Sequence, residues 1–407
     1  MNTYDFILRN GCVIDPANNM SGIYDVGVKD GKIATVKNRI EESGDKEYDV
    51  AGLYVTPGLI DMHCHCYPTF PMYDDSLPTI HPDAHMFRDG VTTAVDAGTT
   101  GWKDFPSFKE HVIDKAKTRV LAFINIADDG MVHLDREQEP SNFHPQIVAS
   151  VAKVFDDVVV GIKSAHYWVG IPFDEKHHPW DSVDSMVEAG ELCGKPCMAD
   201  FQPNLPLRTY PDLILKHLRK GDIHTHVYAQ QFPILNDNGQ VNDYMFKARE
   251  RGVKFDLGHG ACSFWFRNAV PSLKQGFYPD TLSTDLYIDN IFGPVFGMTT
   301  VMSKYLCMGM PFEEIIYRTT KRPAEVIHHE ELGTLSVGSC ADIALFSIRD
   351  GHFSYFDGGR AKIDSHSKIE CAGTFRAGEF VYNPNAMGMP RWEDTPAEYW
   401  TAPGIIH

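Results

Sequence analysis

Short apolar runs alternate with amphipathic stretches through the middle of the chain. Eight runs have the length and apolar content of buried β-strands: residues 53–63, 91–98, 119–127, 158–163, 195–200, 222–227, 253–260 and 281–287. The intervening segments carry helix-type periodicity, and two of them, 181–194 and 211–221, end in glycine after an apolar face. Repeated strand–helix units predict an α/β fold with a parallel sheet, and eight units predict a closed (β/α)8 TIM barrel.

Both ends of the chain show a different, strand-rich pattern. Near the N-terminus, YDFILRNGCVID and YDVGVKDGKIATV contain Asn-Gly and Asp-Gly, which are strong hairpin signals. Near the C-terminus, LGTLSVGSCADIALFSI and IECAGTFRAGEFVYN are again β-rich and broken by glycines. We expect the two ends to pair into one small β-sandwich. The predicted domains are a discontinuous sandwich, 1–52 and 332–407, and a catalytic barrel, 53–331.

Composition narrows the class of protein. The 407-residue chain is 43% hydrophobic and 23% charged, as in folded globular proteins, and its net charge of -18 opposes binding to nucleic acid or anionic membranes. The nine cysteines are scattered, which favours a reducing compartment. The sequence has no signal-peptide pattern and no apolar window long enough to span a membrane. We therefore expect a cytoplasmic protein whose partner is a small-molecule substrate, with a homo-oligomer as an open alternative.

Polar residues with metal-binding chemistry end the first and fourth predicted strands, where a TIM barrel has its active site. His63 and His65 point to one side under strand alternation, and two such imidazoles can chelate a divalent cation, although they could also be an ordinary polar strand end. Lys163 closes the apolar run VVVGIK. A lysine in that dry position must be neutralised, paired or modified, unless its amine extends to solvent.

Further potential ligands end other strands on the same rim. Asp200 ends the fifth strand, His226 the sixth and Asp285 the eighth. His224 shares a face with His226 under strict alternation, so periodicity does not choose between them, whereas position at the strand end favours His226. His259 follows the seventh strand between two glycines, where it could bind substrate or cap the turn.

Residues after Lys163 are candidates for substrate binding. His166, Tyr167 and Trp168 lie on a loop expected to face the site, and they could line a substrate pocket. Trp168 could instead simply cover the barrel mouth. Arg208 could bind a substrate carboxylate, although a surface position is the default expectation for an arginine.

Together these motifs resemble the amidohydrolase superfamily, particularly its dihydroorotase-like branch of amide, cyclic imide and ester hydrolases. The segments that carry the resemblance are NGCVID, DGKIATV, VTPGLIDMHCH, DAGTTG, GIK, FDLGHG, STD and RPAEVIHHEELGTLSVGSCADIALF. The resemblance implies a centre of two divalent metal ions, commonly zinc. In that centre it implies His63 and His65 on one metal, an N6-carboxylated Lys163 as the bridge, His226 on the second metal, Asp285 as ligand and catalytic proton shuttle, and His259 near the substrate.

Asp200 departs from the family pattern, which has a histidine at the end of the fifth strand. Carboxylate oxygen is a harder ligand than imidazole and shifts preference towards manganese. Its negative charge also makes the centre a weaker Lewis acid. Alternatively Lys163 stays unmodified, Asp200 pairs with its ammonium group and one metal binds; we favour two metals.

These features predict a metal-dependent hydrolase that cleaves an amide, cyclic amide or ester bond of a small molecule by metal-bound hydroxide. Asp285 is the predicted general acid and base. Two alternatives stay open: a heterocycle deaminase of the same superfamily, and a non-enzymatic scaffold whose metal site is impaired by Asp200. The lysine bridge favours the hydrolase.

Overall fold

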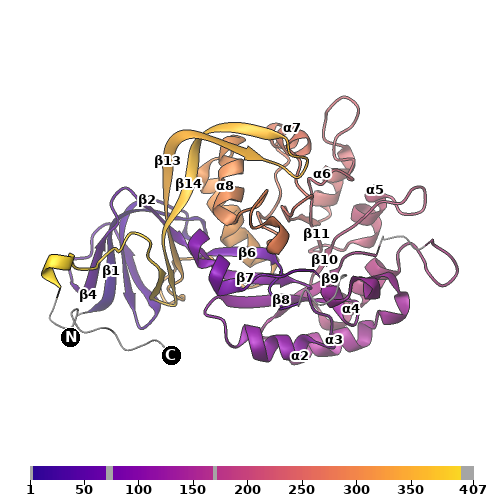
Figure 1. Ribbon diagram of the computed structural model, residues 1–407, viewed down its shortest axis with the longest axis horizontal. Helices are drawn as coiled ribbons and strands as arrows, with labels where there is room; N and C mark the ends of the chain where they lie inside the picture. The colour runs from indigo at the N-terminus through magenta and orange to yellow at the C-terminus, as the bar shows by residue number, and fades with distance from the viewer. Residues whose placement is uncertain (1–2, 70–76, 168–171, 396–407) are drawn as a thin grey trace.

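A parallel sheet of seven strands lies at the centre of the computed structural model, which describes residues 3–69, 77–167 and 172–395 (Figure 1). Its strands are β6 (Leu59–Cys64), β7 (Val91–Ala97), β8 (Arg119–Asn125), β9 (Val159–Ser164), β10 (Cys197–Ala199), β11 (Ile223–His224) and β12 (Lys254–Phe255). Neighbours in the sheet are consecutive in sequence and parallel. These strands correspond to seven of the eight predicted ones.

The eighth predicted strand is not a strand in the structure. Single parallel bridges join Thr281 to Asp256 beyond β12 and Leu286 to Cys64 in β6. Asp285 has a φ of 52°, in the left-handed region, and a strand cannot continue through that conformation. The predicted α/β fold with a parallel sheet is therefore confirmed, whereas a closed ring of eight strands is not formed.

Helices pack against this sheet through an apolar interface. They are α1 (Pro82–His85), α2 (Phe105–Phe108), α3 (Pro145–Val154), α4 (Asp181–Cys193), α5 (Tyr210–Asp212), α6 (Asp243–Glu250), α7 (Phe266–Lys274), α8 (Met298–Cys307), α9 (Phe312–Thr319) and α10 (Lys321–Val326). Figure 1 shows α2, α3 and α4 along the edge of the β7–β9 region. Gly194 ends α4 with a φ of 72°, the left-handed conformation in which a glycine commonly ends a helix. The predicted helix end at this glycine is therefore confirmed. Within the described ranges, none of these helices combines the length and apolarity needed to cross a membrane.

Strands from both ends of the chain form a second sheet. They are β1 (Tyr4–Asp15), β2 (Met20–Lys29), β3 (Lys32–Lys37), β4 (Gly44–Asp49), β5 (Tyr54–Pro57), β13 (Ile343–Phe356), β14 (Lys362–Arg376) and β15 (Glu379–Tyr382). The order is β15-β14-β13-β5-β1-β2-β3, with β4 beside β1. The two ends thus lie in one sheet, but the predicted sandwich of two stacked sheets is not confirmed. The domain limits stay a prediction, and residues 396–407 lie outside the described residues.

Gly58 divides the first predicted central strand. The segment before it, β5, joins the sheet of the chain ends, and the segment after it, β6, joins the central sheet. A side chain at this position would collide with Thr92, so only glycine permits this close approach. One apolar run therefore supplies strands to both sheets, a division that period-two patterning cannot reveal.

The distal halves of β13 and β14 form an arm, residues 348–369, that leaves the second sheet. Figure 1 shows this hairpin arching from that sheet towards α7 and α8. The backbone N–H of Ile369 donates to Ser303 Oγ on α8 at 2.9 Å, and Phe266 N–H at the start of α7 donates to Asp357 at 3.0 Å. The arm thus ties the sheet of the chain ends to the helices around the central sheet.

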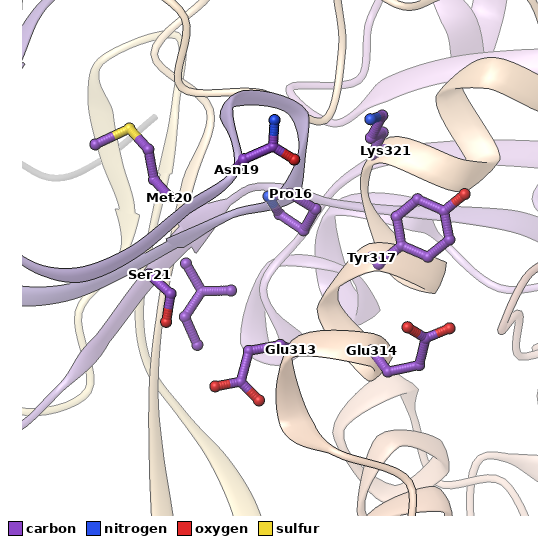
Figure 2. A pocket seen from close by; sticks show the side chains of 9 residues that line it. Pro16, Asn19, Met20, Ser21, Glu313, Glu314, Tyr317 and Lys321 are labelled. Atoms are coloured by element: carbon purple, nitrogen blue, oxygen red, sulfur yellow. The ribbon is translucent and has the colours of Figure 1, made fainter.

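A cleft of about 360 Å³ lies where the turn after β1 meets α9 and α10. Figure 2 shows Pro16 and Asn19 on the turn, with Tyr317 and Lys321 on the helices opposite. Its lining contains none of the residues predicted for catalysis or metal binding.

Candidate metal centre

The predicted site residues gather around a cavity of about 340 Å³. Its lining is His63, His65, Leu77, Met131, Lys163, His166, Asp200, Gln202, His226, Gln230, Gln231, Ala261, Cys262, Ser263, Asp285 and Tyr287. All six predicted metal ligands belong to this set, as does His166. The structure therefore brings together residues that are separated by more than half of the chain.

His63, His65 and Asp285 form the tightest group in the cavity. The Oδ1 atom of Asp285 lies 3.4 Å from His63 Nε2 and 3.1 Å from His65 Nε2. All three residues are buried, and their ligand atoms lie within 4.8 Å of one another. This is the arrangement of donor atoms that one divalent cation requires.

A hydroxyl–carboxylate relay fixes the tautomer of His65. Its Nδ1 atom lies 2.8 Å from Thr99 Oγ1, whose hydroxyl donates to Asp96 Oδ2 at 2.8 Å. Because the hydroxyl proton is used on Asp96, the threonine oxygen must accept from His65 Nδ1–H. The lone pair of Nε2 is therefore directed towards Asp285.

His63 is held by an equivalent relay from another part of the sheet. Its Nδ1 atom lies 2.9 Å from Thr225 Oγ1, whose hydroxyl donates to Asp256 Oδ2 at 2.8 Å. His226 Nδ1 lies 2.7 Å from the carbonyl oxygen of Gly258, which can only accept. In its neutral form each of the three imidazoles thus directs an Nε2 lone pair to the cavity, as metal-binding histidines do when an outer partner orients them.

These contacts fit a bound cation. Two imidazole lone pairs face the same oxygen of Asp285, so three acceptor atoms converge. With both rings neutral and protonated on Nδ1, no proton lies between either Nε2 atom and Asp285, whereas a divalent ion satisfies all three atoms. The donor set of imidazole nitrogen and carboxylate oxygen suits zinc or manganese.

Two of the candidate ligands have a strained backbone. His226 has a φ of 61° and Asp285 a φ of 52°, a region that residues other than glycine rarely adopt. Such strain persists only where the surroundings hold it, and it concentrates at functional sites. His224, by contrast, packs between the rings of Tyr210 and Phe232, and burial lowers its pKa to about 3. The left-handed turn therefore places His226 in the cavity and leaves His224 in the core.

Lys163 is buried at the end of β9, with 1% of its surface exposed. Its Nζ atom lies 3.7 Å from Met198 Sδ, and no carboxylate of the described residues lies within ion-pair distance. Burial lowers the pKa of the amine, against the opposing effect of Asp200 and Asp285. The structure thus shows neither the extension to solvent nor the direct pairing with Asp200 that the sequence left open.

Asp200 lines the cavity beside His226. Its Oδ2 atom is 3.9 Å from His226 Nε2, and its Oδ1 atom accepts the backbone N–H of Phe201 at 2.6 Å. Burial acts to raise the pKa of Asp200, but His226, His166 and Lys163 outweigh it and the pKa is lowered. The carboxylate and His226 are placed to share a second cation.

His166 also lines the cavity and is paired with a carboxylate outside the ligand group. Its Nδ1 atom lies 2.6 Å from Glu137 Oε2. Burial alone would lower the pKa of His166, but Glu137 raises it overall. Trp168, from the same predicted loop, lies outside the described residues.

Two predicted binding residues lie away from the cavity lining. His259 is fully buried, with Nδ1 3.0 Å from the Gly260 carbonyl oxygen and Nε2 2.7 Å from Lys304 Nζ. Arg208, expected at the surface, is fully buried and donates to the carbonyl oxygen of Tyr167 at 2.8 Å. The surface expectation for Arg208 is therefore wrong, because the guanidinium packs 4.3 Å from the ring centroid of Phe201.

Sequence reasoning missed the residues that orient the ligands. Asp96 and Thr99 belong to the DAGTTG motif, and Asp256 belongs to FDLGHG. A carboxylate at the end of a buried strand needs hydrogen-bond donors, so the sequence could have indicated that Asp96 and Asp256 have polar partners. Their pairing with particular histidines could not be predicted, because it joins strands distant in sequence.

No protein-family model matches the chain. A deacetylase of Enterococcus faecalis is 33% identical over 350 residues, which cover 85% of this chain and 90% of that protein. A deacetylase of Agrobacterium fabrum is 29% identical over 344 residues, which cover 81% and 79%. Among solved structures, an adenine deaminase aligns with a TM-score of 0.82 and 29% identity over 93% of this chain and 100% of that one. A dihydroorotase aligns with a TM-score of 0.80 and 26% identity over 93% and 99%.

These likenesses extend over most of both chains, and they coincide with a buried His-His-Asp group whose two histidines lie at the end of strand β6. The chain belongs to the amidohydrolase superfamily, and it is a hydrolytic enzyme of the dihydroorotase-like kind.

Proposed function

We propose that this enzyme removes an acyl group from a small molecule by metal-dependent hydrolysis of an amide or ester bond. The observation that carries the proposal is the convergence of His63 Nε2 and His65 Nε2 on the Asp285 carboxylate, with His226 Nε2 3.9 Å from Asp200 in the same cavity. The likeness to two proteins named deacetylases supports acyl transfer to water as the reaction class. A cavity of about 340 Å³ suits a small molecule.

Two sets of residues would hold the metal ions. His63, His65 and Asp285 would hold the first ion, and His226 with Asp200 would hold the second. Divalent ions bound there would polarise the substrate carbonyl and lower the pKa of the attacking water. We propose zinc, with manganese as the alternative that the Asp200 carboxylate favours.

Lys163 would join the two sets as an N6-carboxylated lysine. Carboxylation needs the neutral amine, whose nitrogen attacks the carbon of CO2 to form an N–C bond while one proton leaves to solvent. The lowered pKa of the buried Lys163 amine favours that neutral form. The resulting carbamate is an anion, and it would remove the cost of burying an unpaired ammonium group.

Asp285 would move the proton. Its carboxylate contacts both His63 and His65 and lines the cavity, so it reaches the place where a substrate carbonyl would be attacked. It would accept a proton from the attacking water and deliver it to the leaving nitrogen or oxygen. His166, paired with Glu137 through Nδ1 and lining the same cavity, would donate a hydrogen bond to the substrate.

Deamination of a heterocycle is the second candidate. The structural likeness to an adenine deaminase favours it, since that reaction also adds water to an unsaturated carbon beside nitrogen. The two candidates differ in product, because deamination releases ammonia and deacylation releases a carboxylic acid. A cytoplasmic location and the lack of nucleic-acid and membrane partners stay predictions from composition.

The deciding experiment combines metal analysis with product detection. The purified full chain is assayed for metal content and incubated with N-acyl amino acids, acetyl esters, cyclic ureides and, for the deaminase candidate, adenine. We expect about two ions per chain and release of a carboxylic acid that a chelator abolishes. Ammonia release without acid would favour the deaminase, and a metal-free, inactive protein would overturn both candidates.

A further inference from the structure

Lys304 is a buried lysine outside the metal centre, with 1% of its surface exposed. Its Nζ atom, on α8, has three polar neighbours: the carbonyl oxygen of Pro294 at 2.8 Å, the carbonyl oxygen of Phe356 at 2.7 Å and His259 Nε2 at 2.7 Å. Phe356 ends β13, in the arm defined above. One amine thus joins α8, the turn after β12 and the arm.

The contacts determine where the protons lie. An ammonium group has three donors, which match two carbonyl oxygens and one imidazole lone pair. His259 Nδ1 then carries the proton and donates to the Gly260 carbonyl oxygen at 3.0 Å. In the opposite tautomer, an unprotonated Nδ1 would face that carbonyl oxygen, so two acceptors would repel.

The pKa of His259 agrees with this arrangement, whereas burial of Lys304 acts against its charged form. Burial and the adjacent Lys304 charge hold the pKa of His259 well below its usual range. Burial lowers the pKa of Lys304 to about 7, against the effect of Asp357, while the two carbonyl oxygens favour the charged amine. The Asp357 carboxylate is itself occupied by the backbone N–H groups of Phe266 and Ala361.

His259 lies in the turn that supports two candidate active-site residues. The Gly258 carbonyl oxygen accepts from His226 Nδ1 at 2.7 Å. Gly260 packs directly against Asp285, because a side chain at Gly260 would collide with the Asp285 carboxylate. A shift of the His259 ring would therefore move the supports of both His226 and Asp285.

We infer that Lys304 is a positioning residue for hydrolysis: it locks the tautomer of His259 and joins the turn Gly258–Gly260 to the arm. The inference rests on the proposed function for the roles of His226 and Asp285. It assigns the arm from the chain-end sheet a part in catalysis, although no residue of the arm lines the described cavity. It also explains why His259 is buried beside the site and does not line the cavity.

The test uses zinc-loaded full chain with 15N-labelled histidine, in which NMR reports the protonation of each ring nitrogen. The His259 signal is identified by its loss in His259→Gln. We expect an unprotonated Nε2 in the wild type. In Lys304→Met, His259 Nε2 and two carbonyl oxygens lose their common donor, so Nε2 should gain a proton while Nδ1 keeps the proton that it donates to Gly260. A protonated Nε2 in the wild type overturns the inference without any variant at Lys304.

Activity is measured on the same samples with 4-nitrophenyl acetate. We expect kcat to fall about tenfold or more in Lys304→Met while KM stays within about twofold, since a misplaced proton shuttle affects the chemical step. Ser303→Ala is the matched control, because it removes the link of α8 to Ile369 without touching His259. In Ser303→Ala, the protonation of His259 and the value of kcat should remain those of the wild type.

The outcomes separate the two proposals. A folded Lys304→Met with unchanged His259 protonation and unchanged kcat overturns the positioning role. Equal losses in Ser303→Ala and Lys304→Met also overturn it, because general loosening of α8 would then explain both. A wild type that hydrolyses no acyl compound overturns the proposed function, while the protonation change at His259 still supports the tautomer lock.

Discussion

The Nε2 atom of His65 lies 3.1 Å from the Oδ1 atom of Asp285, and the Thr99 relay leaves this nitrogen without a proton. His63 Nε2 lies 3.4 Å from the same oxygen, and the contact of His63 Nδ1 with Thr225 places the proton of the neutral ring on Nδ1 in the same way. Lone pairs that face one another in a buried site need a cation between them. The roles of the surrounding residues in metal binding and proton transfer can therefore be tested by single substitutions.

Asp285→Asn should separate metal binding from proton transfer. An amide oxygen can still coordinate a metal, but it cannot accept and return a proton. We expect nearly unchanged metal content and a fall in kcat of about a hundredfold or more. The control is Asp289→Asn, because Asp289 is exposed in the same segment. Wild-type turnover in Asp285→Asn would rule out the proton shuttle.

Thr99→Val should weaken metal binding without removing a ligand. The variant keeps the shape of the side chain but removes the acceptor that orients His65. Loss of such an outer partner typically costs about 10- to 100-fold in metal affinity. Competition with a chromogenic chelator measures the change. Thr100→Val is the control, since its buried hydroxyl has no hydrogen-bond partner in the described structure. Equal affinities for the two variants would contradict the relay.

Lys163→Ala should abolish binding of the second metal ion. The variant removes the amine that would carry the bridging carboxylate, so metal content should fall from about two ions to about one or fewer. A short carboxylic acid should restore part of the activity by supplying the missing oxygen atoms. Mass spectrometry of the wild type under CO2 tests the modification directly. Unchanged metal stoichiometry in Lys163→Ala would refute the bridge.

Asp200→His should change which metal the enzyme prefers. Replacing carboxylate oxygen by imidazole nitrogen favours zinc over manganese and raises the net charge of the centre. We expect the ratio of zinc to manganese affinity to rise, together with the activity of the zinc form. Affinities and kcat measured with each metal give the answer. A ratio equal to that of the wild type would show that Asp200 is not a ligand.

The His166–Glu137 pair should make stability depend on pH. The pKa of His166 is raised in the folded protein, so its stabilising effect is complete below the unfolded value of about 6.5 and is lost as pH rises through the folded pKa. Compared with His166→Gln, the wild type should show its largest advantage in Tm at pH 5 to 6, with a smaller one at pH 9. Glu137→Gln should reproduce this trend. Parallel Tm curves would contradict the coupling.

Much of the central sheet was predictable because buried parallel strands are short, continuous apolar runs. Strand β7 and strand β9 lie within one residue of the expected limits at each end. The run containing Gly58 was mispredicted as one strand, since it feeds two sheets and its division depends on contact with Thr92. The arm was not predicted, because its polar residues pack on helices that are distant in sequence.

The candidate ligands follow from the residues themselves. Strand alternation aligns His63 with His65, and the family motifs bring in Lys163, His226 and Asp285. Alternation could not choose between His224 and His226, because the positive φ of His226 breaks the period of two on which such reasoning depends.

Local patterning therefore sets the α/β class, the parallel strands and the chemistry at their ends, since apolar periodicity and residue type act over a few neighbours. Three-dimensional packing sets the rest. The tautomers of His63 and His65, the burial of Arg208 and the link from Lys304 to His259 each require side chains from separate elements to meet. A proton's position depends on the partner across the contact, and that partner is known only once the chain has folded.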